Sequence, residues 1–140
     1  MTKLGQETKG LKPLDVDGHV SSVQWSPRLG DDRLLLVRAK DPSVDAGLMY
    51  KRTLIVNLAG QTLASISNPG KLGKLAWSPD GRHVALAAGV DINDPDNSEL
   101  FIANSQTGVM RSVIPNIPGR ADNFSWNGNE KVLMLSLIHI

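Results

Sequence analysis

A motif built around tryptophan recurs three times in this chain and limits what the chain can fold into. Its copies are residues 23–27 (VQWSP), 75–81 (LAWSPDG) and 124–128 (FSWNG). The three tryptophans, which are all that the chain contains, lie 52 and 49 residues apart. A period of about 40–50 residues is typical of architectures in which one supersecondary unit packs against the next copy of itself.

Short apolar runs bounded by turn residues follow each copy of the motif. They are too short for helices, so we expect β-strands. The expected strands are 20–25, 33–40, 52–58 and 61–66 in the first unit, 72–77, 83–89, 99–104 and 109–114 in the second, and 123–126 and 131–136 in the third. Residues 8–14 occupy the place of the last strand of a preceding unit. The sequence therefore predicts an all-β fold of four-stranded antiparallel sheets.

Four-stranded units at this spacing are the pattern of β-propeller blades. We therefore expect residues 1–140 to form one partial propeller of about two and a half blades. In this division, 1–19 end a preceding blade, 20–68 and 69–118 are blades, and 119–140 are a truncated blade. Because an indole is a large flat group suited to packing between sheets, we expect all three tryptophans in the core rather than acting as exposed ligand platforms.

Local chemistry supports the predicted hairpins. Pro79 lacks a ladder donor and holds Ser78 extended, so the preceding strand should end there. Gly81 then accepts the positive φ that the reversal requires. Gly60 and Gly108 punctuate the third and fourth strands in the same way.

Composition excludes several classes of function. The chain has 15 Lys and Arg against 14 Asp and Glu, spread evenly, so no basic stripe is present and we expect no nucleic-acid partner. The absence of cysteine excludes disulfides and thiolate metal sites. Apolar runs do not exceed five residues, so we expect no membrane span. No signal peptide is visible at the N-terminus, and the localisation stays open.

The Trp-Ser-Pro-Asp-Gly hairpin with its following apolar strand resembles the blade repeat of TolB-like propellers over nearly the whole chain. Residues 68–77 (NPGKLGKLAW), 89–95 (GVDINDP) and 50–52 (YKR) are more narrowly similar to the N-terminal propeller of bacterial prolyl-oligopeptidase-family serine peptidases. That resemblance implies a propeller that gates and selects substrates for a separate C-terminal hydrolase domain, which carries the catalytic Ser, Asp and His.

The sequence departs from that family because it has no Gly-x-Ser-x-Gly nucleophile elbow. We therefore expect a non-catalytic fragment whose partner is its own hydrolase domain or a protein or peptide ligand. The alternative is a TolB-like interaction propeller with no enzymatic domain. A nucleophile elbow further along the same reading frame would distinguish the two.

The histidines do not suggest a site. His19, His83 and His139 are not at metal-ligand spacing, and strand-edge or surface positions explain them better. Lys51 and Arg52 could contact an acidic substrate, but the start of an exposed strand is the simpler interpretation.

One acidic cluster, 91–99 (DINDPDNSE), could be imagined to hold Ca²⁺. Pro95 takes a usual ligand position and Asp96 stands where an EF-hand loop needs glycine, so we interpret it as a solvated loop. We expect no catalytic, cofactor-binding or metal-binding residue and no cofactor. Binding is expected on the face that carries the long second-to-third loops, 41–50 and 90–98.

Overall fold

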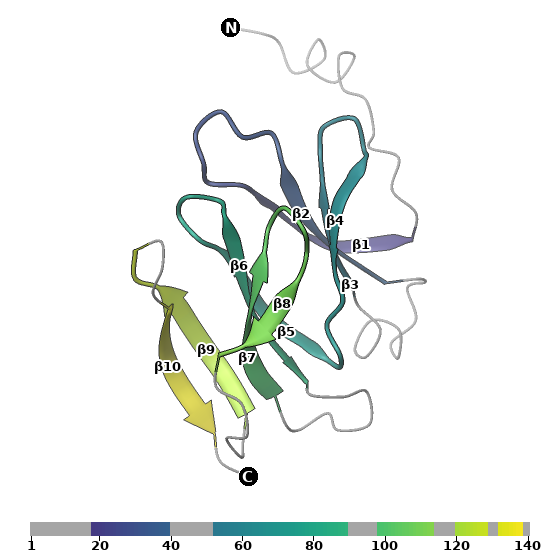
Figure 1. Ribbon diagram of the computed structural model, residues 1–140. Helices are drawn as coiled ribbons and strands as arrows, with labels where there is room; N and C mark the ends of the chain where they lie inside the picture. The colour runs from purple at the N-terminus through teal and green to yellow at the C-terminus, as the bar shows by residue number, and fades with distance from the viewer. Residues whose placement is uncertain (1–17, 40–51, 90–97, 114–119, 129–131, 139–140) are drawn as a thin grey trace, which may run out of the picture.

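The computed structural model describes residues 18–39, 52–89, 98–113, 120–128 and 132–138 (Figure 1). These residues contain ten strands and no helix. The strands are β1 (His19–Trp25), β2 (Leu34–Ala39), β3 (Arg52–Val56), β4 (Thr62–Ile66), β5 (Leu72–Trp77), β6 (His83–Gly89), β7 (Ser98–Asn104), β8 (Met110–Ser112), β9 (Arg120–Trp126) and β10 (Val132–Ile138). Every strand expected in the three units is confirmed, whereas residues 8–14 lie outside the described residues.

The strands form two four-stranded antiparallel sheets and a hairpin, each built from neighbours in sequence. The first sheet has the order β1-β2-β3-β4, and in the second β5, β6, β7 and β8 pair in turn. The β9–β10 hairpin joins the second sheet through one parallel pair, Ser98 with Arg120. In Figure 1 the units follow one another across the view, from β1–β4 at the right to the yellow hairpin at the left.

The tryptophan motif sets the same register in every unit. Trp25 pairs with Leu34, Trp77 with Val84, and Trp126 with Val132, so each tryptophan lies opposite the first or second residue of the next strand. The strand before each turn ends at its tryptophan, as Pro79 predicts for the second unit.

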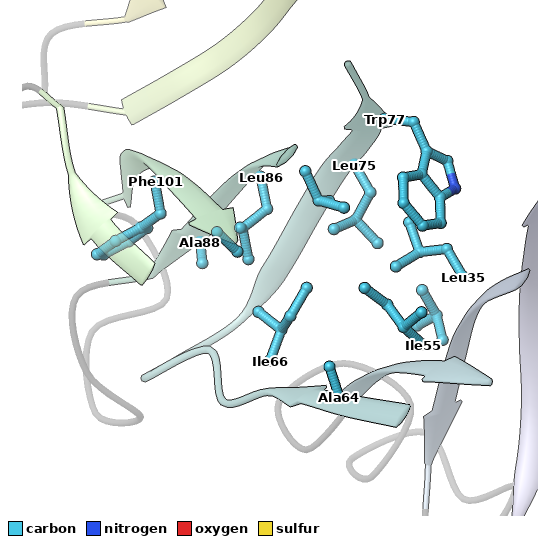
Figure 2. Packing of buried hydrophobic residues seen from close by; sticks show 12 residues of the cluster. Leu35, Ile55, Ala64, Ile66, Leu75, Trp77, Leu86, Ala88 and Phe101 are labelled. Carbon is cyan, nitrogen blue, oxygen red and sulfur yellow. The ribbon is translucent and has the colours of Figure 1, made fainter. Parts of the chain in front are cut away.

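The main core lies between the two sheets, because the inner strands bury both of their faces. In β2, Leu35 and Val37 face the second sheet, whereas Leu34 and Leu36 belong to a separate cluster on the opposite face. The inter-sheet cluster consists of Leu35, Val37, Ile55, Ala64, Ile66, Leu75, Trp77, Val84, Leu86, Ala88, Phe101 and Ala103 (Figure 2). A third cluster on the far face of the second sheet includes Phe124 of β9. The units are therefore stacked face to face.

The expectation that all three tryptophans are buried is only partly correct. Trp77 is 7% exposed and lies in the inter-sheet cluster, and Trp126 is half-buried. Trp25, however, is 60% exposed, so its assignment to the core is wrong. The physical reason is that each tryptophan packs against the sheet that precedes it, and no described sheet precedes the first.

Candidate binding groove between two sheets

The contact between successive units is the same at both junctions. The indole Nε1–H of Trp77 donates to the carbonyl of Gln24 at 3.3 Å, and that of Trp126 donates to the carbonyl of Ala76 at 3.0 Å. Each acceptor is the residue just before the tryptophan of the preceding unit. The same indole-to-carbonyl contact therefore links the first unit to the second and the second to the third.

Side chains of the preceding unit also donate hydrogen bonds to backbone carbonyls of the following unit. Gln24 Nε2 donates to the Leu75 carbonyl at 3.2 Å, and Lys74 Nζ donates to the Phe124 carbonyl at 2.7 Å. Both acceptors stand two residues before a tryptophan. The donors differ, but the acceptor position in the repeat is the same.

In the first unit, the β1–β2 turn is organised around a carboxylate. The Ser26 hydroxyl donates to Asp31 Oδ2 at 2.6 Å, and the backbone N–H of Arg33 donates to Asp31 Oδ1 at 3.1 Å. The Arg33 guanidinium also grips the carboxylate, with Nε 2.9 Å from both oxygens and Nη2 2.7 Å from Oδ2. This bidentate pairing is the strong form of an arginine–carboxylate contact.

The second unit repeats the serine–carboxylate pairing without the arginine fork. The Ser78 hydroxyl donates to Asp80 Oδ1 at 2.7 Å, and the same oxygen accepts the backbone N–H of Arg82 at 3.1 Å. Both hydrogen bonds lower the pKa of Asp80, and the bond from the Ser78 hydroxyl has the larger effect. Gly81 follows with φ of 72°, which confirms the predicted reversal.

Arg33 then reaches across to the second sheet and joins three loops. Its Nη2 donates to the Gly81 carbonyl at 2.8 Å, and its Nη1 donates to the Ser105 hydroxyl at 3.0 Å. Ser105 is buried and itself donates to the Gly81 carbonyl at 2.6 Å. The guanidinium carbon also lies 5.3 Å from the ring centroid of Trp77. One arginine thus ties the first hairpin to both loops of the next sheet on this face.

The Asp31–Arg33 pair is electrically neutral over the physiological pH range. The hydrogen bonds from the Arg33 side chain lower the pKa of Asp31 from 3.8 to about 2, against the opposing effect of burial. Because the carboxylate stays ionised, it cancels the charge of Arg33 but contributes no surplus negative charge.

Two adjoining hollows lie on this turn-bearing face of the molecule. One, of about 480 Å³, is lined by Arg28, Leu29, Gly30, Asp31, Arg33, Leu63, Ser105 and Gln106. The other, of about 360 Å³, is lined by Arg28, Arg33, Gly81, Arg82, His83, Asn104, Ser105 and Gln106. The hollows share Arg28, Arg33, Ser105 and Gln106, and we refer to them together as the hairpin groove.

The hairpin groove carries surplus positive charge. None of the hydrogen bonds or ion pairs within the described part of the chain engages the guanidinium of Arg28. The Arg82 guanidinium lies 3.9 Å from Asp80, and with the arginine side chain 73% exposed this ion pair is weak. The groove can therefore hold an anion. Among the described residues, no group of three or more His, Cys, Asp or Glu could hold a metal ion.

The candidate residues examined in the sequence do not come together. His19 is exposed at the start of β1, and His83 is half-buried at the start of β6 and lines the hairpin groove. Arg52 begins β3 and is half-buried, so the exposed strand start expected there is not found. Lys51 and His139 lie outside the described residues.

Most of the acidic loop 91–99 also lies outside the described residues, namely positions 91–97. Its last two positions, Ser98 and Glu99, belong to β7, and Glu99 accepts a hydrogen bond from the Ser112 hydroxyl at 2.6 Å. The long loops 41–50 and 90–97 lie outside the described residues too. Binding on their face stays a prediction.

Sequence reasoning missed the hairpin groove, which lies on the face with the short turns. Arginines next to the repeated motif were a signal, but the contacts of Arg33 span 48 residues to Gly81 and 72 to Ser105. Residues so far apart carry no local pattern that pairs them.

Compared with protein-family models, curated proteins and solved structures, the chain matches none. Within the part of the chain that the structure describes, no helix is long and apolar enough to cross a membrane.

Proposed function

We propose that this chain is part of a β-propeller with a non-catalytic role: gating and selecting substrates for a serine peptidase of the prolyl-oligopeptidase family. The propeller half of the proposal is supported by one observation above others. The indole of each following unit donates to the same backbone carbonyl of the unit before it, at both junctions.

A propeller requires the same relation between each sheet and the next, and the repeated contact supports this arrangement. The contacts that repeat all join the first strand of one unit to the first strand of the next, β1 to β5 and β5 to β9. In the proposed propeller these would be the innermost strands of the blades. Burial of β2, β3 and β6 on both faces also fits a stack in which each sheet is covered by its neighbours.

The peptidase half rests on the resemblance of residues 50–52, 68–77 and 89–95 to the propellers of that family. A gating propeller needs a rigid frame and a binding surface rather than a nucleophile. The stacked sheets supply the frame, and the hairpin groove is a surface feature that a peptide can occupy. The same features serve a TolB-like interaction propeller, which is the alternative.

The complete reading frame separates the two functions. We expect a Gly-x-Ser-x-Gly elbow followed by Asp and His downstream of these blades. A fluorophosphonate probe should then label the whole protein at that serine and leave the 140-residue chain unlabelled, because labelling requires an activated serine. A reading frame that closes after its last blade without an elbow overturns the peptidase role and leaves the interaction propeller.

A direct structure of the whole protein tests the propeller itself. Four-stranded sheets turned about one axis are the expected result. Sheets stacked in an open array, with no common axis, would overturn the propeller arrangement whatever the downstream sequence encodes.

A further inference from the structure

The hairpin groove combines features that a solvated crevice does not need. It lies where two sheets meet, its wall is fixed by the largely buried Arg33–Ser105–Gly81 hydrogen bonds, and its lining includes both arginines and exposed leucines. A wall held in this way is preorganised, so a ligand does not have to order it.

The surplus charge comes from two arginines. Arg28 lines both hollows and so stands where they join, and Arg82 lines the second hollow. Among the described residues, Asp31 is the only carboxylate that lines either hollow, and it is neutralised by Arg33. A guanidinium presents planar paired donors that match the two oxygens of a carboxylate.

The first hollow adds apolar surface beside this charge. Leu29 is fully exposed and Leu63 of β4 is 46% exposed, and both line the hollow that Arg28 shares. A free inorganic anion gains nothing from contact with these apolar side chains. A ligand that carries an apolar group next to its anionic group can contact both the leucines and the arginine.

We propose that the hairpin groove binds a peptide carboxylate, held by Arg28 and Arg82, with an adjacent apolar side chain of the peptide against Leu29 and Leu63. The Gln106 side chain, which lines both hollows, supplies a further polar contact. The carboxylate is either the C-terminus of the peptide or an acidic side chain. This site belongs to the two described sheets and does not depend on a hydrolase domain.

The test is a ¹H–¹⁵N NMR titration of the full 140-residue chain with short peptides. The first probe, acetyl-Ala-Ala-Leu with a free carboxylate, is compared with its C-terminal amide. The second, acetyl-Ala-Leu-Glu-amide, carries only a side-chain carboxylate. We expect saturable shifts of the Arg28, Arg82 and Gln106 amides with at least one carboxylate probe. The amide lacking a carboxylate should bind about tenfold more weakly, as expected for loss of a charged hydrogen-bonding group.

Matched variants assign the contacts. Arg28→Gln and Arg82→Gln should each weaken the carboxylate probe about tenfold, whereas Arg111→Gln, an exposed arginine of β8 outside the groove, should leave binding unchanged. Leu63→Ser should weaken the binding of the leucine peptide but leave the binding of acetate unchanged. The side chains of Arg28 and Arg82 are exposed and not part of the core, so these variants should keep the wild-type far-UV circular dichroism.

Several results would overturn the proposal. These are equal binding of the amide lacking a carboxylate, inorganic phosphate binding as tightly as the peptide, or shifts that map outside the groove. Preference for one carboxylate probe over the other identifies the source of the carboxylate. None of these outcomes depends on whether a nucleophile elbow is found downstream, so the site and the peptidase role fail separately.

Discussion

Replacing Trp77 with alanine measures how much the stacking of the two sheets contributes to stability. Its indole lies in the inter-sheet cluster and is 7% exposed. An aromatic side chain buries roughly 150–250 Å², which at about 25 cal/mol per Å² is worth about 4–6 kcal/mol. Measured truncations of buried tryptophan and phenylalanine cost about 3–5 kcal/mol, and we expect Trp77→Ala to lower the free energy of unfolding by that amount.

The polar part of the contact can be separated from the apolar part. Trp77→Phe keeps an aromatic ring near the guanidinium of Arg33 but removes the indole N–H that donates to the Gln24 carbonyl. The partly buried Gln24 carbonyl loses this donor, and the net value of such a hydrogen bond is about 1 kcal/mol. Loss of ring area adds to this. Trp77→Phe should therefore cost roughly half of what Trp77→Ala costs.

The other tryptophans provide internal controls. Trp126 is half-buried, so Trp126→Ala should cost about 1.5–2.5 kcal/mol if the loss scales with buried area. Trp25 is 60% exposed and should cost about 1 kcal/mol or less on the same scale. The expected order is Trp77, then Trp126, then Trp25.

Urea unfolding followed by far-UV circular dichroism is the suitable assay, because it does not rely on tryptophan emission. Compared at equal m-values, the midpoints give the order directly. A Trp25→Ala loss as large as that of Trp77→Ala would refute the reasoning. A loss below about 1 kcal/mol for Trp77→Ala would mean that the indole is not packed between the sheets, and the interpretation of the tryptophans as ligand platforms would return.

Three further substitutions test the polar junction and the turns. Arg33→Met should cost about 3 kcal/mol in the same assay, because it leaves the largely buried Asp31 carboxylate, whose side chain is 10% exposed, without its ion pair; a loss below about 1 kcal/mol would contradict this. The folded-state pKa of Asp31, about 2, lies below its ordinary value of 3.8, so its contribution is present above pH about 4 and lost as the pH falls toward 2. Asp31→Asn should therefore be less stable than wild type at pH 7 and should lose most of this difference by pH 2, and a constant difference across this range would disprove the linkage. Gly108→Ala should cost about 1–2 kcal/mol more than Gly30→Ala, since both glycines have positive φ but a Cβ at Gly108 alone would overlap the Ser65 carbonyl; equal losses would refute this.

The strands were predictable because their signals are local. Apolar runs of strand length and turn residues at fixed places define each hairpin, and tertiary contacts do not have to be known to find them. The end of β5 at Trp77 and the positive φ of Gly81 follow from the residues Pro79 and Gly81 themselves. The same local signals fixed the register, since each tryptophan closes its strand.

Burial and the groove were not predictable in the same way. Whether a tryptophan at the repeat position is covered depends on a neighbouring sheet, and Trp25 and Trp77 are followed by the same Ser-Pro pair. The role of Arg33 depends on a carbonyl and a hydroxyl that are distant in sequence, at Gly81 and Ser105. A repeat predicts what its units share, but a site formed between units requires the packing.

Departures from the repeat therefore decide what the groove can bind. The Ser26 N–H donates to the Arg33 carbonyl and the Ser78 N–H to the His83 carbonyl, so Arg33 and His83 are equivalent positions. An imidazole has at most two N–H donors and cannot form the five-donor fork with which Arg33 joins three loops. A junction built on His83 would then lack the fixed wall found beside Arg33, even with the same backbone. The repeat therefore sets the backbone of each junction, and the residue at the position of Arg33 or His83 decides whether an anion can bind there. We expect anion binding only at the junction between the first two sheets.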